Sequence, residues 1–168
     1  MGTPARRVVR REHGVDVTAA DGSIRPYDKV VLATHADEAL ALLGDASAEE
    51  ARLLGAFRYS RNRTVLHTDA SALPAVRQAW ASWNSDIEDC ADASAPVSVT
   101  YHLNRLQSLP GDVQFCVSLN RPKPVGGEVL AAMDYTHPIL DRVAVAAQPG
   151  VAALNGTRHT YYAGAHLR

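Results

Sequence analysis

The stretch Tyr27-Asp28-Lys29-Val30-Val31-Leu32-Ala33-Thr34-His35-Ala36-Asp37 decides how the fold is read. An apolar strand ends here in small polar residues, and a segment of helical composition follows. Strand ends of this kind are where open α/β sheets bind ligands. Because residues 29–34 are almost continuously apolar, we expect a strand that is covered on both faces.

A glycine-rich phosphate-binding turn is absent from the sequence. Dinucleotide-binding folds place G-x-G-x-x-G after the first strand, so that backbone N–H groups approach the pyrophosphate. None of the 11 glycines falls in such a run. The sequence therefore predicts a chain that adds to a ligand-binding sheet without cradling a dinucleotide's phosphates by itself.

Composition excludes several functional classes. The 168 residues are 46% apolar and carry a formal net charge of −1, which is ordinary for a globular domain and gives no support for nucleic-acid binding. No apolar run approaches the length of a membrane span. Two cysteines and seven scattered histidines lack disulfide-framework or metal-ligand spacing, so we expect no metal site and a cytoplasmic location. The abundance of Ala, Arg and Val suggests a bacterial gene.

We expect an α+β fold, in which a β-meander leads into a mostly antiparallel or mixed sheet with flanking helices. In the first half, Asp21-Gly22 predicts a hairpin turn, and Ser47 with Glu50 predicts a capping box that starts a helix over 48–54. Another helix is expected over 36–43, ended by Gly44. Strands are predicted over residues 7–11, 15–20, 23–26, 29–34 and 63–68.

The second half has a β-rich rhythm. Runs over 97–103, 113–119 and 129–135 are separated by turn signals and predict an antiparallel meander. Residues 139–148 fit either a helix or irregular structure, and 160–163 fit a last short strand. The polar, acidic segment 85–95 is the best candidate for a mobile loop.

Three segments carry a resemblance to a known family. The first joins Val8-Val9-Arg10 to the strand end quoted above, the second runs from Trp80-Ala81-Ser82-Trp83-Asn84 to Gln107, and the third is Asn155 to His166. Together they resemble the flavin-containing amine oxidase superfamily, and within it a bacterial branch of NAD/FAD-binding, amine-oxidase-like proteins.

The resemblance implies a partial enzyme. Residues 1–35 would belong to the FAD domain, residues 36–155 to an α+β substrate domain, and residues 156–168 to a returning strand of the FAD domain. The intact enzyme would pass a hydride from a substrate C–H to FAD. We expect the chain alone to be inactive and not to bind FAD tightly, because the dinucleotide-binding half would lie outside it.

The resemblance also assigns candidate site residues. The backbone of Val8 would contact the adenine, Thr34 and His35 would lie near the dinucleotide, and Ala163 with Gly164 would approach the flavin ribityl chain. Thr34 or His35 also fits the N-cap of the next helix. Relatives often have Glu where this chain has Ala165. A small-molecule substrate cavity would be lined by aromatic residues that fit simple core packing equally well: Trp80, Trp83, Tyr101, Tyr135 and Tyr162.

A second hypothesis belongs to a different class. The chain could be a non-catalytic binding or assembly module that forms a homodimer through its exposed strands, since open strand edges invite pairing. The alternative to a homodimer is a missing N-terminal dinucleotide-binding half as the partner. The sequence does not name the substrate or a catalytic base.

Overall fold

The computed structural model describes residues 2–87, 91, 97–123 and 125–167. The chain divides into two compact units: unit 1 comprises Met1–Ser60 with Pro138–Arg168, and unit 2 comprises Arg61–His137. The boundaries between these units therefore follow residues 60 and 137, whereas the segments inferred from the resemblance end at residues 35 and 155. Their assignment to an FAD domain and a substrate domain stays a prediction.

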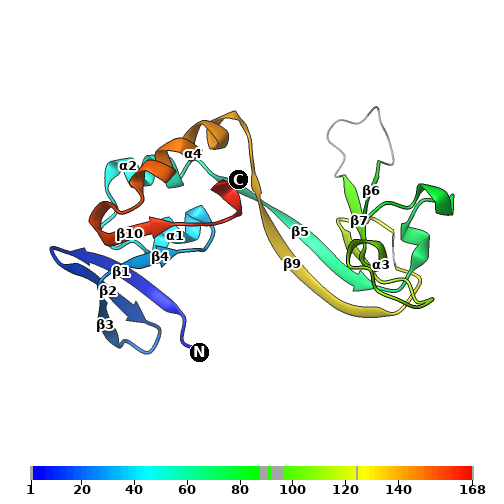
Figure 1. Cartoon of the computed structure of the whole chain (residues 1–168), viewed down its shortest axis with the longest axis horizontal. Helices are drawn as coiled ribbons and strands as arrows, with labels where there is room; N and C mark the ends of the chain where they lie inside the picture. The colour runs from blue at the N-terminus through cyan, green and yellow to red at the C-terminus, as the bar shows by residue number, and fades with distance from the viewer. Residues whose placement is uncertain (1, 88–90, 92–96, 124, 168) are drawn as a thin grey trace. The chain divides into compact units, whose positions relative to one another are not determined.

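Unit 1 contains two small sheets (Figure 1). Strands β1 (Ala5–Arg11), β2 (Gly14–Ala19) and β3 (Ile24–Tyr27) form an antiparallel sheet. The predicted hairpin turn is present between β2 and β3, where Asp21 accepts hydrogen bonds from Ser23. Strands β4 (Val30–Leu32) and β10 (Thr160–Tyr162) form a parallel pair, although they are far apart in sequence.

Three helices pack with these sheets around the core of unit 1. They are α1 (Ala36–Leu42), α2 (Ala48–Leu54) and α4 (Arg142–Leu154). The predicted capping box is confirmed: Ser47 Oγ accepts a hydrogen bond from Glu50 N, and Glu50 Oε2 accepts one from Ser47 N. Apolar side chains from the helices and strands fill one cluster, which includes Val8, Leu32, Leu54, Val151 and Tyr162.

Two local expectations for unit 1 are wrong. Strand β4 is not covered on both faces, because Val31 is 62% exposed while Leu32 is buried. Among the described residues this short strand pairs with β10, and Leu32 packs into the core of unit 1. Helix α1 does not end at Gly44 either: Leu43 is its C-cap, and Gly44 N donates to Val8 O, which ties the helix end to β1.

Unit 2 is built on a five-stranded sheet of order β6-β7-β8-β5-β9. The strands are β5 (Arg58–His67), β6 (Trp83–Asp86), β7 (Ser98–His102), β8 (Cys116–Leu119) and β9 (Val129–Ile139). The pairs β6–β7, β7–β8 and β8–β5 are antiparallel. The predicted meander is right for β7 and β8, which pair antiparallel, and wrong for β9, because β5 lies between β8 and β9. Alternation fixes which face of a strand is buried, but it does not choose the neighbour.

Short helical elements complete the described chain. Helix α3 spans Leu103–Leu106, and single 3-10 turns occur at Ala70–Ala72, Arg77–Ala79, Thr157–His159 and Ala165–Leu167. The helical interpretation of 139–148 is right, and α4 extends it. Most of the expected loop over 85–95 lies outside the described residues, and so does Cys90. The α+β class with mainly antiparallel sheets is confirmed. No described helix is long and apolar enough to cross a membrane.

Candidate functional site

The carboxyl ends of β4 and β10 lie side by side. The parallel register pairs Tyr162 with Leu32, and Ala163 N donates to Leu32 O at 3.0 Å. A Cβ placed on Gly164 would lie 3.3 Å from the backbone oxygen of Thr34. Two segments separated by about 130 residues of sequence thus meet at one sheet end, which is the usual place for a ligand in a parallel sheet.

The structure brings four of the predicted site residues to this strand end. Thr34, Ala163 and Gly164 are exposed, and His35 is half-buried. Thr34 Oγ1 donates to His35 O at 3.1 Å. Small residues here leave backbone groups open to an approaching molecule, so the arrangement suits a ligand that touches the main chain.

His35 has a structural role of its own. It is the N-cap of α1, and its backbone N–H donates to the carboxylate of Glu38 at 3.2 Å. The imidazole stacks on Tyr59 with ring centroids 4.3 Å apart. Tyr59 Oη in turn accepts a hydrogen bond of 2.7 Å from Ala36 N. The capping interpretation of this position is right for His35, and Tyr59 is a neighbour that sequence reasoning missed.

His166 is the second residue that sequence reasoning missed. It is 3% exposed, lies edge-on to Phe57 at 5.0 Å, and would be only 2.8 Å from a Cβ on Gly164. Burial lowers the pKa of His166, and the charge of His35 lowers it further, while Asp37 partly opposes them. A neutral imidazole thus lies beneath the strand end. The position of His166, two residues after Gly164, was a sequence signal that could have identified it. No comparable signal in the sequence pointed to Tyr59.

Val8 lies apart from these residues, in β1 of the other sheet. Its side chain is 1% exposed, and its carbonyl oxygen already accepts a hydrogen bond from Gly44 N. Only the backbone of Val8 could meet a ligand, as the resemblance implies. Contact with an adenine stays a prediction.

Tyr162 belongs to a buried polar network in unit 1. Tyr162 Oη donates to Glu50 Oε1 at 2.8 Å, and Arg10 holds both carboxylate oxygens of Glu50 at 2.8 Å. Asp45 and Arg158 extend the network at its exposed side. Burial raises the pKa of Glu50, but the hydrogen bonds from Arg10, Ser47 and Tyr162 and the charge of Arg10 bring it down to about 2. Glu50 is therefore a structural carboxylate, ionised throughout the neutral range.

The other aromatic candidates lie in unit 2. Trp83 is 67% exposed and meets Tyr101 edge-on at 5.9 Å across the β6–β7 pair. Trp80 lies edge-on to His102 at 5.2 Å, and its Nε1–H donates to Pro74 O at 2.8 Å. Tyr135 is 52% exposed on β9. Tyr162 belongs to unit 1 and the other aromatic candidates to unit 2, and their substrate role stays a prediction.

A buried His–Ser pair in unit 2 resembles a hydrolase dyad but has the wrong tautomer. His67 Nδ1 accepts a hydrogen bond from Asp69 N at 3.1 Å, so a neutral ring carries its proton on Nε2. Nε2 lies 2.9 Å from Ser118 Oγ. Burial lowers the pKa of His67, which keeps the ring neutral. Nε2 therefore donates to the hydroxyl and cannot take its proton, as a general base must.

Cys116 is equally unsuited to chemistry. The side chain is fully buried in β8, and burial raises the pKa of its thiol to about 11. The thiolate is the nucleophilic form, so this cysteine is inert at neutral pH. The expectation of a core thiol is confirmed.

Comparison with known proteins identifies solved structures that share this fold. No family model and no curated protein match the chain. A CLA-producing fatty acid isomerase from P. acnes matches with a TM-score of 0.59 and 18% identity, over 96% of this chain and 42% of the isomerase. Cyclohexylamine oxidase from Brevibacterium oxydans IH-35A matches with a TM-score of 0.58 and 14% identity, over 98% and 42%. Putrescine oxidase bound to putrescine matches with a TM-score of 0.57 and 10% identity, over 98% and 43%.

The similarity is one of fold. The chain has the architecture of a part of these isomerase and amine oxidase structures, which confirms the partial resemblance in fold expected from the sequence. It spans about two fifths of the length of each solved chain. At such low identity neither activity nor substrate transfers from them.

Proposed function

We propose that the chain is the strand-end and substrate-domain portion of an FAD-dependent oxidoreductase of amine-oxidase type. The observation that carries the proposal is the parallel β4–β10 pair, whose carboxyl ends present Thr34 beside Gly164. The shared fold with part of three flavin-type enzymes supports it. In the intact enzyme, FAD would accept a hydride from a substrate C–H.

The residues at the strand end fit the ribityl side of FAD and not its pyrophosphate. Exposed Thr34, Ala163 and Gly164 offer a close approach to the main chain, while buried His166 and half-buried Tyr59 lie next to them. No G-x-G-x-x-G run is present to hold the pyrophosphate. We therefore assign phosphate binding to a second, glycine-rich unit, and ribityl-side contacts to this chain.

Other parts of the chain would then have supporting roles. The backbone of Val8 would face the adenine, and Trp80, Trp83 and Tyr101 would contact a small-molecule substrate. No residue is assigned as a general base, because the sequence supports none. A cytoplasmic location fits the reduced, buried Cys116.

A homodimeric assembly module is the second candidate. Exposed apolar residues on the strands of unit 1 favour it: Val31 is 62%, Ile24 63% and Tyr27 49% exposed. Apolar surface on open strands promotes association. In this case a second copy would cover the surface that the glycine-rich unit covers in the oxidoreductase.

Flavin titration separates the two candidates. The purified chain is titrated with FAD, and binding is followed by flavin absorbance and fluorescence. The titration is then repeated on the chain co-expressed with a glycine-rich dinucleotide-binding polypeptide from the neighbouring gene. The oxidoreductase predicts no tight FAD binding by the chain alone and a stable yellow complex with the partner. Thr34→Tyr should weaken flavin retention in that complex, and exposed Thr3→Tyr should not. A stable dimer with no flavin in either sample would favour the module.

A further inference from the structure

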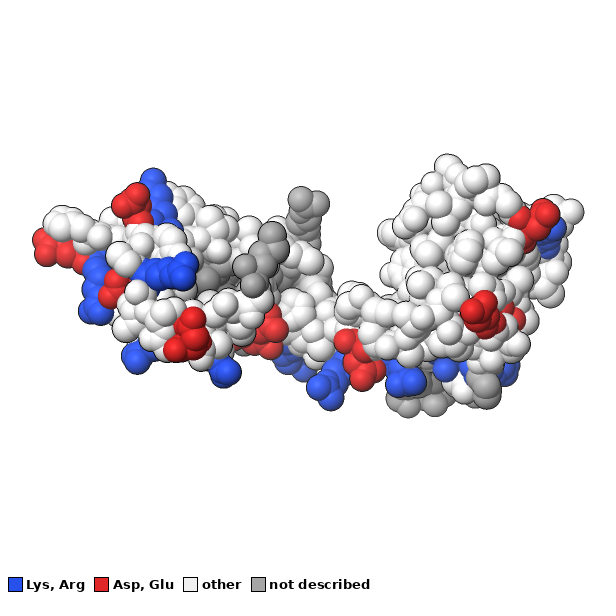
Figure 2. Space-filling model, turned by 90° about the horizontal axis from the view of Figure 1, so that it is seen from below, with Lys and Arg blue, Asp and Glu red and all other residues white. Residues whose placement is uncertain are grey.

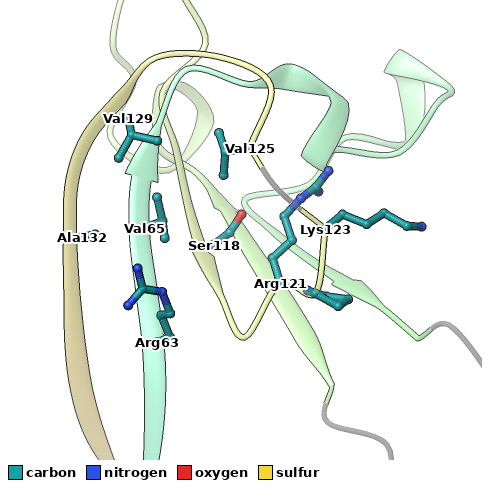
Figure 3. A pocket seen from close by; sticks show the side chains of 9 residues that line it. Arg63, Val65, Ser118, Arg121, Lys123, Val125, Val129 and Ala132 are labelled. Atoms are coloured by element: carbon teal, nitrogen blue, oxygen red, sulfur yellow. The ribbon is translucent and has the colours of Figure 1, made fainter.

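Unit 2 contains a cavity that the proposed function does not use. Its volume is about 320 Å³, at the lower end of the range for small-molecule sites. Figure 3 shows its walls: β5 supplies Arg63 and Val65, β9 supplies Val129 and Ala132, and β8 supplies Ser118. The segment after β8 closes the remaining side with these residues: Arg121, Pro122, Lys123 and Val125.

The charge of the lining has one sign. Three of the lining residues are basic (Arg63, Arg121 and Lys123), and none of the described lining residues is acidic. This concentration is local, since the chain has a net charge of −1 and Figure 2 shows basic and acidic side chains interspersed on the face in view. A cavity with one sign of charge raises the local concentration of oppositely charged ligands.

Two of these cations form no salt bridge with any residue that the structure describes. Among the residues that the structure describes, neither Arg63 nor Arg121 forms an ion pair. The Nε–H of Arg121 is also buried without a hydrogen-bond acceptor in the described chain. A buried donor without a hydrogen-bond partner is unfavourable, so Arg121 adds an unsatisfied cationic group to the lining beside Arg63.

Asp69 contributes negative charge near this region without lining the cavity. Its carboxylate oxygens accept hydrogen bonds from Gly126 N and Ser71 N, at 2.8 and 2.9 Å. Burial raises the pKa of Asp69, but these bonds and the charge of Arg121 lower it below its usual value. The carboxylate is therefore already engaged by backbone donors, and it only partly offsets the field of Arg121.

The rest of the lining is apolar. The apolar part of the lining consists of Val65, Val125, Val129, Ala132 and the ring of Pro122. On β5, Val65 follows Arg63 by two residues, so both side chains project from the same face of the strand. The floor carries the hydroxyl of Ser118, which His67 holds in place at 2.9 Å. A cation beside an apolar wall suits a ligand with an anionic head and an apolar tail.

We propose that this cavity binds a small organic carboxylate, with the carboxylate at Arg63 and the apolar group against the three valines. The same charges exclude an alkylammonium ligand of equal size, because the cavity would place like charges together. Carboxylate binding at this site requires neither flavin nor the glycine-rich dinucleotide-binding unit. It can therefore be tested independently of the proposed oxidoreductase function.

The test compares three probes that share one tail: hexanoate, hexylamine and hexanol. Calorimetry and methyl NMR of the full chain measure affinity and location. We expect hexanoate to bind at about millimolar dissociation constant, at least about ten-fold more tightly than either other probe, with shifts at the methyls of Val65, Val125 and Val129. Equal binding of the three probes, or no hexanoate binding at about 10 mM, overturns the proposal.

Variants locate the site. Arg63→Gln should weaken hexanoate binding about ten-fold, equivalent to about 1.4 kcal/mol, and Arg63→Lys should retain part of it. Arg61→Gln is the matched control, because it removes the same charge from the same exposed strand but does not line the cavity. Val129→Glu places a carboxylate at a 52% exposed position and should abolish binding without disturbing the core. Equal effects of Arg61→Gln and Arg63→Gln would overturn the assignment.

Discussion

Tyr162 donates a hydrogen bond of 2.8 Å to Glu50, and this bond joins the last strand, β10, to the first turn of α2. Arg10 of β1 holds the same carboxylate through two further bonds of 2.8 Å. Three segments from the start, the middle and the end of unit 1 therefore meet on one buried anion. The parallel β4–β10 pair, and with it the candidate site, depends on this anchor.

Glu50→Gln should destabilise unit 1 by about 3–5 kcal/mol, because it leaves the buried Arg10 guanidinium without a counter-charge. The side chain of Arg10 is only 1% exposed and that of Glu50 4%. Urea unfolding followed by far-UV circular dichroism measures the loss in the helices of unit 1.

Glu49→Gln is the matched control for this variant. Glu49 pairs with Arg52 at 3.8 Å, and both side chains are about two thirds exposed, so the loss should stay below about 1 kcal/mol. Similar losses in the two variants would mean that the buried network is not the anchor.

The same carboxylate predicts how stability depends on pH. In the folded chain the pKa of Glu50 is lowered from 4.5 to about 2. A carboxyl group with a depressed folded pKa stabilises the fold fully above its unfolded pKa, and this contribution is lost as the pH falls. We therefore expect the stability gap between wild type and Glu50→Gln to be constant above about pH 5 and to shrink between about pH 4.5 and 2. Urea midpoints at a series of pH values measure the gap, and a gap independent of pH contradicts the assignment.

Tyr59→Phe should cost about 1–3 kcal/mol, because the fully buried N–H of Ala36 then loses its acceptor. Amide exchange of Ala36 should accelerate, while the aromatic stack on His35 remains. Tyr27→Phe is the control, since Tyr27 is 49% exposed and should tolerate the change within about 0.5 kcal/mol. Unchanged exchange at Ala36 would show that this hydrogen bond does not stabilise the start of α1.

Two adjacent glycines in unit 2 should respond differently to alanine. A Cβ on Gly127 would lie 2.7 Å from Asp69 N and 2.9 Å from the Thr68 carbonyl carbon, so Gly127→Ala should cost about 1–3 kcal/mol. A Cβ on Gly126 would stay 3.6 Å from Asp69 Oδ2, and Gly126→Ala should be nearly neutral. Both tryptophans lie in unit 2, so their fluorescence follows this transition. Equal midpoints for the two variants would refute the close approach.

Local signals predicted local structure well. Ser47 with Glu50 located the start of α2, and Asp21-Gly22 located the β2–β3 turn, because each motif satisfies its own backbone groups. The strand expected over 29–34 was found at the right place, but it is shorter than predicted and ends at Leu32, two residues before Thr34.

Features that depend on distant partners were not predictable in this way. The exposure of Val31 depends on what covers β4, and the insertion of β5 between β8 and β9 depends on pairing across long loops. Tyr59, at the start of β5, contacts the candidate site by accepting a hydrogen bond from Ala36 N, although the two residues are 23 positions apart in the sequence. Such contacts are selected by packing over the whole unit, and a single local pattern does not encode them.

Unit 2 enters the chain as an insertion whose two ends are neighbours. β5 and β9 pair, Asn62 Nδ2 lies 2.9 Å from His137 Nδ1, and Arg58 meets Asp141 at 2.8 Å. An inserted segment whose two ends are adjacent can be lengthened, shortened or exchanged without changing the path of the rest of the chain. Unit 2 could therefore be replaced by a short turn, in evolution or by protein engineering, while the strand ends near Thr34 and Gly164 kept their structure.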